Sequence, residues 1–211
     1  MKIKNLISKK LLELIMIFLV LPLLLAIPFL PLARVALGFI GLIYVIWVSK
    51  KLKFFSFKKV SVGIKMQHVY FLAAKFIIIS IITYFIVSEF YSQELFKSLL
   101  DNPLKFLIIC LIYIIGSVVP QEFIYRDFFF KRYYNFFPND ILFVLVNGIL
   151  FSLAHLFFYN KLVLLMTLVG GWIFSFTYLQ TRSLRFTILE HTLYGCWLYA
   201  VGLGSILGFP N

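Results

Sequence analysis

The chain has 211 residues, of which 63% are hydrophobic and 13% are charged, and its mean hydropathy is +1.01. Soluble domains carry about 25% charged residues, so this composition excludes a soluble globular fold and predicts an integral membrane protein. The net charge of +12 comes from Lys and Arg residues that fall mostly in short clusters between apolar runs. Such clusters are typical of cytoplasmic loops that contact anionic lipid, so we expect membrane lipids, and no nucleic acid, as partners.

Seven apolar runs follow one another along the chain. A membrane-spanning helix needs about 20 apolar residues, so seven helices use nearly the whole length and leave only short loops. We therefore predict an all-α fold, a polytopic transmembrane helix bundle of about seven helices that forms one membrane domain over residues 1–211. The predicted helices are residues 11–33, 35–48, 69–90, 104–132, 141–159, 162–178 and 186–207.

The first run contains Pro22, Pro28 and Pro31. Proline removes a backbone donor, so we expect this helix to be kinked or split near its end. Lysines precede the run as in a signal peptide, but the run continues past a signal's usual length, and we take it as a retained helix. Residues 50–65, after the second run, interleave Lys with Phe and indicate a cytoplasmic loop with aromatic rings at headgroup level.

Charge also orients the remaining helices. The linker after the third run carries acidic and basic residues that nearly cancel, which is expected outside the cell. Basic clusters at residues 131–132 and 182–185 indicate returns to the cytoplasm. Counting crossings places the N-terminus in the cytoplasm and the C-terminus outside, and we expect the membrane to be the plasma membrane of a bacterium.

Few ionisable residues lie deep inside the apolar runs, where a charge costs about 2.5–17 kcal/mol unless it is paired or used. Glu122 belongs to the sequence PQEFIYR, residues 120–126. It lies one helical turn before Arg126, so the two side chains can pair at i, i+4. Most other acidic residues lie at predicted segment ends, near water, namely Glu13, Glu89, Glu94, Asp101 and Asp140.

Two histidines also lie deep in apolar runs, His155 in the fifth and His191 in the seventh. Asn147, Phe151 and His155 recur at intervals of four, which places them along one face of a helix. One buried histidine is explained by a single interhelical hydrogen bond. Two histidines, a Glu–Arg pair and an Asn on neighbouring helices indicate a shared functional site. His68 lies at a loop edge, and we assign it no role.

The order of these motifs resembles the CAAX protease and bacteriocin-processing family (CPBP, also called Abi) of intramembrane proteases, whose best-known members are the type II CAAX prenyl endopeptidases. The resemblance covers residues 104–208, so we expect a CPBP-like core there, preceded by N-terminal helices in residues 1–103. It implies a hydrolase that cleaves a peptide bond of a membrane-associated protein or peptide, with or without an attached lipid. The family pattern is Glu-Glu-x-x-x-Arg, Phe-x-x-x-His and His-x-x-x-Asn.

Carried over residue by residue, the resemblance implies catalytic roles for Glu122, His155 and His191. It implies supporting roles for Gln121, Arg126, Asn147, Phe151 and Gly195. Two of these positions depart from the family pattern, because Gln121 stands where the family has its first Glu and Gly195 stands where it has Asn. An amide cannot take a proton from water as a carboxylate does, so Glu122 must become the base if catalysis is retained.

Four hypotheses remain open for the site. The resemblance favours a metal-independent peptidase without a cofactor, in which Glu122 and His155 polarise a water and His191 donates to the developing oxyanion. A zinc site with these three side chains as ligands is the second, although no close-spaced ligand pair such as HExxH is present. The third is a degenerate CPBP homologue that acts as a membrane binding or scaffold protein. The fourth is a proton-coupled transporter, which the absence of an inverted repeat disfavours.

Overall fold

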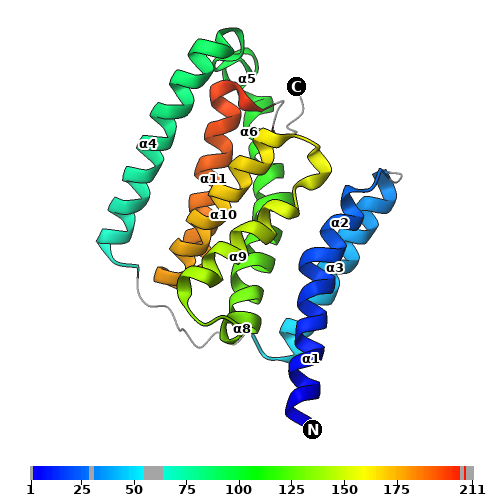
Figure 1. The fold of residues 1–211 in the computed structure, drawn as a ribbon. Helices are drawn as coiled ribbons and strands as arrows, with labels where there is room; N and C mark the ends of the chain where they lie inside the picture. The colour runs from blue at the N-terminus through cyan, green and yellow to red at the C-terminus, as the bar shows by residue number, and fades with distance from the viewer. Residues whose placement is uncertain (1, 29–30, 55–63, 205–206, 208–211) are drawn as a thin grey trace. The chain divides into compact units, whose positions relative to one another are not determined.

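The computed structural model describes residues 2–28, 31–54, 64–204 and 207. Within these residues all regular structure is helical (Figure 1), and the predicted all-α membrane fold is confirmed. The chain forms two compact units, each built from two stretches of sequence. The first unit comprises Met1–Lys59 and Phe123–Phe176, and the second comprises Val60–Glu122 and Thr177–Asn211.

Five helices in the described part of the chain are long and apolar enough to cross a membrane, and the chain is an integral membrane protein. The two other predicted runs, residues 11–33 and 186–207, also contain helices, but these are shorter or interrupted. The five candidate spans are Leu32–Lys51, Met66–Phe90, Pro103–Phe136, Asp140–Phe158 and Lys161–Thr181.

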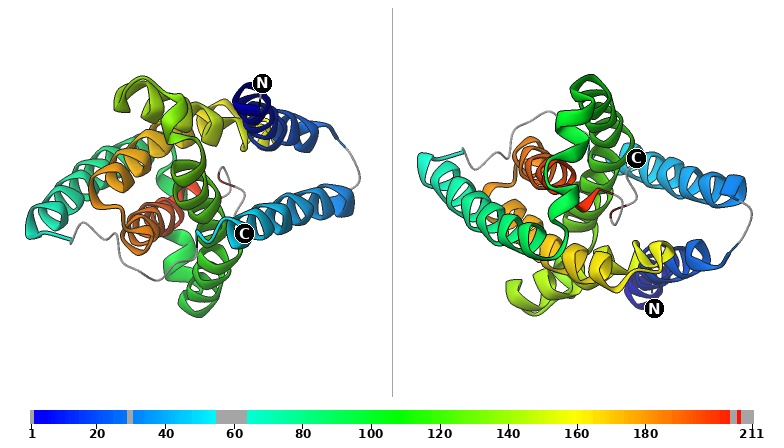
Figure 2. Two further views of the ribbon diagram at one scale, coloured as in Figure 1. Left: turned by 90° about the horizontal axis from the view of Figure 1, so that it is seen from below. Right: turned by 90° about the horizontal axis from the view of Figure 1, so that it is seen from above.

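The first unit begins with a helical hairpin. Its first arm comprises α1 (Lys2–Ile15), the π-turn η1 (Met16–Val20) and α2 (Leu21–Ala26), and its second arm is α3 (Pro31–Lys51). Pro22 has no N–H to donate, and the π-turn η1 lies just before it. The first arm ends because Ile27, which precedes Pro28, is extended with φ −68° and ψ 139°, as steric contact with a following proline requires. The predicted split is therefore observed, and Figure 2 shows the two arms diverging.

The rest of the first unit packs around buried aromatic rings. It contains η4 (Phe123–Phe128), α8 (Phe129–Tyr133), η5 (Tyr134–Phe136), α9 (Asp140–Leu153), η6 (Leu156–Phe158) and α10 (Lys161–Thr181) as far as Phe176. Phe18 of η1 is fully buried and meets the ring of Phe129 edge-on at 4.9 Å between centroids. Helices α9 and α10 approach at two glycines, since a Cβ on Gly171 would lie 2.9 Å from the Cα of Gly148. Small residues permit such close packing of membrane helices.

The second unit contains α4 (Met66–Phe90), η2 (Ser92–Glu94), α5 (Lys97–Asp101), α6 (Pro103–Tyr113), η3 (Ile114–Val118), α7 (Val119–Glu122), the end of α10, α11 (Leu184–Leu198) and η7 (Tyr199–Leu203). Helix α11 packs against α4, beside which it runs in Figure 1, and against η3 and α7. Asn102 caps α6 by accepting a hydrogen bond from the Lys105 N–H, and Pro103 occupies the first turn, where its missing donor costs nothing.

The loop 50–65 falls largely outside the described residues, since residues 55–63 are not described, and the predicted division of the chain at residue 103 stays a prediction. His68 has a structural role that its position did not suggest. Its Nδ1 accepts a hydrogen bond from the Lys65 N–H at 3.1 Å and caps the start of α4.

Candidate functional site

The helix that carries Gln121 and Glu122 has an irregular backbone around Pro120. Pro120 cannot donate to an α-helical ladder, and the π-turn η3 precedes it, with the Val119 N–H bonded to the Ile114 carbonyl five residues back. A second π-turn, η4, follows directly after Glu122. Each π-turn holds one residue more than an α-turn, which rotates the following side chains by about 100° around the axis. The direction of Glu122 is therefore set partly by the backbone.

Glu122 is fully buried, and its Oε1 lies 2.9 Å from Nδ1 of His191. His191 is carried by α11, which begins where the Ser183 side chain accepts a hydrogen bond from the Phe186 N–H. The ring of Tyr113 stands edge-on to the imidazole, with ring centroids 6.1 Å apart. A carboxylate in such contact fixes the orientation of the imidazole ring and determines which ring nitrogen faces it.

The side chain of Gln121 points to a different partner. Its Nε2 donates to the Ser117 Oγ, 2.9 Å away and one turn earlier on the same helix. Gly195, which is buried one turn after His191, lies directly under Tyr113, so that a Cβ at position 195 would overlap the hydroxyl and the ring. Tyr113 therefore occupies the space into which a side chain at position 195 would extend.

Arg126 lies in the first unit and is fully buried. Its guanidinium is 4.6 Å from the ring centroid of Phe151 and 5.6 Å from that of Phe174. Its Nη2 donates to the Gly171 carbonyl at 3.4 Å. Contact with two aromatic faces offsets part of the cost of removing this charge from water. Arg126 thus joins α9 and α10 through Phe151, Gly171 and Phe174.

The spacing predicted Asn147 and His155 on one face of a helix; Asn147 lies on α9, but His155 does not, because α9 ends at Leu153. Asn147 Nδ2 donates to the Tyr125 carbonyl at 2.9 Å, and the Ser175 hydroxyl lies 2.6 Å from Asn147 Oδ1. His155 lies just beyond the last residue of α9, where its Nδ1 is 2.8 Å from the Phe151 carbonyl. These bonds satisfy buried polar groups of the first unit and fix the orientation of both side chains.

Residues 103–197 match the model of a protein family described as Type II CAAX prenyl endopeptidase Rce1-like. This segment belongs to the CAAX protease (CPBP) family. The CPBP segment begins at the first residue of α6, ends near the end of α11 and contains every predicted site residue. The resemblance seen in the motifs is thus confirmed, and with it the assignment to a family of CAAX-type intramembrane proteases. No curated protein and no solved structure shows a significant match to the chain.

The structure distributes the predicted CPBP site residues over both units. Gln121, Glu122, His191 and Gly195 belong to the second unit, where Glu122 meets His191. Arg126, Asn147, Phe151 and His155 belong to the first unit and are connected as described above. The predicted pair of Glu122 with Arg126 and the predicted common site of Glu122, His155 and His191 join residues of different units, and they stay predictions.

A second buried carboxylate, which received no role from the sequence, lies one residue before His191. Glu190 is fully buried, and its Oε1 is 2.5 Å from Nζ of Lys75 on α4 and 3.0 Å from the Tyr194 hydroxyl. Lys75 also donates to the Thr177 hydroxyl at 3.0 Å. The signal in the sequence was Lys75 itself, a single cation inside the apolar run 69–90, because such a residue requires a counter-charge.

No cluster of three or more His, Cys, Asp or Glu side chains occurs in the described part of the chain. The contact between Glu122 and His191 supplies two groups that commonly bind zinc. The third predicted ligand, His155, lies in the first unit, so the zinc site stays a hypothesis. The arrangement within the second unit is a buried carboxylate that orients an imidazole, which is a combination suited to proton transfer.

Proposed function

We propose that the protein is an intramembrane endopeptidase that cleaves a peptide bond of a membrane-associated protein or peptide, with or without a lipid, at a water activated by Glu122 and His191. The observation that carries the proposal is the 2.9 Å contact between Glu122 Oε1 and His191 Nδ1 around a fully buried carboxylate. Membership of residues 103–197 in a protease family supplies the reaction class. The substrate and the mechanism belong to the proposal.

The proposed chemistry follows from how Glu122 orients the histidine. When the Glu122 carboxylate accepts the Nδ1–H of neutral His191, the other ring nitrogen, Nε2, becomes the acceptor that can take a proton from water. The water oxygen attacks the peptide carbonyl, its proton passes to Nε2, and Nε2 returns a proton to the amine that leaves. The charge that develops on His191 is stabilised by Glu122, and low polarity around the pair strengthens that interaction.

This pairing changes one role that the family resemblance implied. His191 acts as the partner of Glu122 in activating water, where the resemblance made it the donor to the oxyanion. We keep His155 as a further member of the site. Arg126, Asn147 and Phe151 remain supporting residues of the site. We also keep a metal-independent reaction, a cytoplasmic N-terminus and the bacterial plasma membrane as parts of the proposal.

A second candidate function, a non-catalytic binding or scaffold protein, is favoured by the two positions that depart from the family pattern. Gln121 is engaged with Ser117 of its own helix, and Tyr113 fills the space beside Gly195. Both departures are thus accommodated by packing and hydrogen bonds, as expected if the fold were kept for binding. Only turnover can separate the two functions.

The test is a cleavage assay with the full chain reconstituted in lipid vesicles, across membrane-anchored peptides with and without a prenyl group. We expect Glu122→Gln and His191→Ala each to lower turnover by about 10²–10⁴-fold, the usual contribution of general acid–base catalysis. Gln121→Ala serves as the matched neighbour and should retain turnover, because its amide bonds to Ser117. Thermal unfolding of each variant separates loss of catalysis from loss of structure.

Each outcome decides between the proposals. Equal turnover of the wild type and folded Glu122→Gln rules out the assigned pair, and no turnover by the wild type on any peptide supports the scaffold function. Loss of turnover in folded His155→Ala supports a site that includes both histidines. Turnover that survives a strong chelator supports the metal-independent mechanism, whereas turnover restored only by added Zn²⁺ supports the zinc hypothesis.

A further inference from the structure

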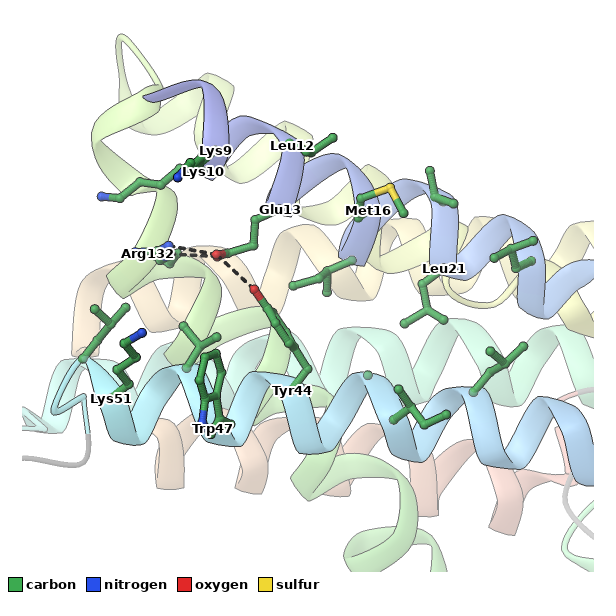
Figure 3. Close-up of a pocket in the computed structure, with 18 residues that line it drawn as sticks. Lys9, Lys10, Leu12, Glu13, Met16, Leu21, Tyr44, Trp47, Lys51 and Arg132 are labelled. Atoms are coloured by element: carbon green, nitrogen blue, oxygen red, sulfur yellow. Dashed lines mark hydrogen bonds and ion pairs between the residues drawn. The ribbon is translucent and has the colours of Figure 1, made fainter. Parts of the chain in front are cut away.

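We infer that the groove between the two arms of the N-terminal hairpin binds one anionic phospholipid, with its acyl chain between the arms and its headgroup at Lys9, Lys10 and Lys51. The groove lies within the first unit and has a volume of about 780 Å³, which is in the range of sites that hold small molecules. Figure 3 shows its lining side chains along α1, η1, α2 and α3. It lies outside the matched protease segment, apart from Arg132.

The walls of the groove are apolar over most of their length. Beyond the charged end the lining side chains are hydrocarbon or thioether groups of both arms, namely Leu12, Met16, Ile17, Val20, Leu21, Leu24, Leu37 and Ile40. These groups offer no hydrogen-bond partner, so an extended peptide in this groove would leave its backbone polar groups unsatisfied, at a cost of several kcal/mol for each. An acyl chain has no such groups. The walls therefore favour a hydrocarbon chain over an extended peptide.

One end of the groove is strongly positive. Its lining includes four cations, Lys9, Lys10, Lys51 and Arg132, and one carboxylate, Glu13, which leaves a net charge of +3. Figure 3 shows these residues gathered at the same end. An anionic headgroup is favoured there, because each lysine near a membrane surface attracts anionic lipid.

Glu13 does not cancel the attraction of the lysines, since it already has its own partners. Arg132 Nε and Nη2 each donate to the Glu13 carboxylate at 2.8 Å, and the Tyr133 hydroxyl donates at 2.7 Å. The side chains of Glu13 and Arg132 are only 11% and 14% exposed. Because Glu13 and Arg132 neutralise each other, Lys9, Lys10 and Lys51 remain available to bind the anionic headgroup.

The dimensions and the aromatic residues fit one leaflet of a bilayer. From Glu13 to Leu24 the first arm extends about 17 Å at 1.5 Å per residue, and half of a hydrocarbon core is about 15 Å thick. Trp47 lines the charged end, with Lys51 Nζ 5.0 Å from its ring centroid. Tryptophan is enriched at the membrane–water interface, so the lysines stand at headgroup level while the apolar walls extend into the acyl region.

Trp47 provides the probe for the test. The protein is reconstituted in vesicles of phosphatidylglycerol and phosphatidylcholine, with bromine on the acyl chains of one lipid or the other, and emission is compared with that of Trp47→Phe to isolate the signal of Trp47. We expect brominated phosphatidylglycerol to quench Trp47 at a mole fraction several-fold lower than brominated phosphatidylcholine. The triple variant Lys9→Gln, Lys10→Gln, Lys51→Gln should lose this preference, so that both brominated lipids quench Trp47 at the same mole fraction.

Two matched controls keep the test specific. The triple variant Lys97→Gln, Lys105→Gln, Lys161→Gln removes the same charge from positions outside the groove and should keep the preference. Ile40 and Ile43 are both 63% exposed on α3, but only Ile40 lines the groove. Ile40→Phe should reduce quenching by brominated phosphatidylglycerol, and Ile43→Phe should leave it unchanged.

Three results would overturn the inference. Equal quenching by both brominated lipids means ordinary contact with bulk lipid, and a preference that survives removal of Lys9, Lys10 and Lys51 means that the headgroup binds elsewhere. Absence of quenching by either lipid means that a protein segment covers the groove. Equal quenching by brominated phosphatidylglycerol in Ile40→Phe and Ile43→Phe would show that the lipid does not lie between the arms.

Discussion

Alanine at position 195 tests how closely the second unit packs around its buried histidine. A Cβ there would overlap the hydroxyl and ring of Tyr113, whereas a Cβ on Gly116, in the same unit, meets nothing within 4 Å. Replacing a helical Gly by Ala stabilises a helix by about 0.5–1 kcal/mol, and overpacking costs about 1–3 kcal/mol. Gly116→Ala should therefore stabilise the protein, and Gly195→Ala should be about 1–3 kcal/mol less stable than Gly116→Ala.

Thermal unfolding in detergent, followed by circular dichroism, measures this difference. For a chain of this size 1 kcal/mol corresponds to about 2–4 °C in Tm, so the two variants should differ by about 2–12 °C. In a Tyr113→Ala background the overlap is absent, and Gly195→Ala should lose its cost, with a coupling free energy of about 0.5–3 kcal/mol. The reasoning is refuted if the two alanine variants unfold together, or if the Tyr113 and Gly195 changes are additive.

The same packing predicts that restoring the family residue does not restore function. Gly195→Asn adds a larger side chain to the space that Tyr113 fills, so it should unfold at a lower temperature than Gly195→Ala and should not raise turnover in the peptide assay. A gain of turnover in Gly195→Asn would show that Tyr113 can move aside.

Three further predictions concern packing elsewhere. Lys75→Met leaves Glu190 buried without its cation and should destabilise the protein by about 3 kcal/mol or more in chemical unfolding. Combining Lys75→Met with Glu190→Met should recover part of that loss. A loss below about 1 kcal/mol in Lys75→Met would contradict this prediction. Gly171→Ala should lower Tm more than Gly170→Ala, because the first Cβ meets backbone at 2.9 Å and the second meets only the edge of a phenyl ring at 3.3 Å; equal Tm values would argue against close approach of α9 and α10. Tyr133→Phe removes a 2.7 Å hydrogen bond to the carboxylate on α1 and should cost about 1.5–3 kcal/mol in the same unfolding assay; an unchanged free energy of unfolding would contradict it.

The helices could be predicted because hydropathy and span length act over many residues at once. Each of the seven apolar runs contains helix, and the split of the first run followed from Pro28, which acts locally. The end of α9 could not be predicted. The run 141–159 remains apolar past Leu153, so nothing in it marks the place where the helix stops and His155 leaves the helical face.

Glu122 and His191 could be singled out from the sequence, but their contact could not. Glu122 and His191 stand out because ionisable residues in apolar runs are costly. The i, i+4 rule that pairs Glu122 with Arg126 assumes an unbroken α-helix, whereas π-turns lie on both sides of Glu122, so this pair stays a prediction. The contact between Lys75 and Glu190 depends on the packing of α4 against α11, which the sequence does not show.

The π-turns around Pro120 have a consequence for how this protein is compared with its relatives. Motif comparison aligns sequence positions, whereas the contacts of a side chain depend on the direction in which it leaves the helix axis. One residue inserted upstream turns every later side chain by about 100°, so a homologous position and an equivalent position can differ by one. The carboxylate in contact with the histidine is Glu122, the immediate neighbour of the Gln121 that breaks the family pattern. In this helix the π-turn before Pro120, as well as the position in the sequence, sets the direction in which Glu122 leaves the axis.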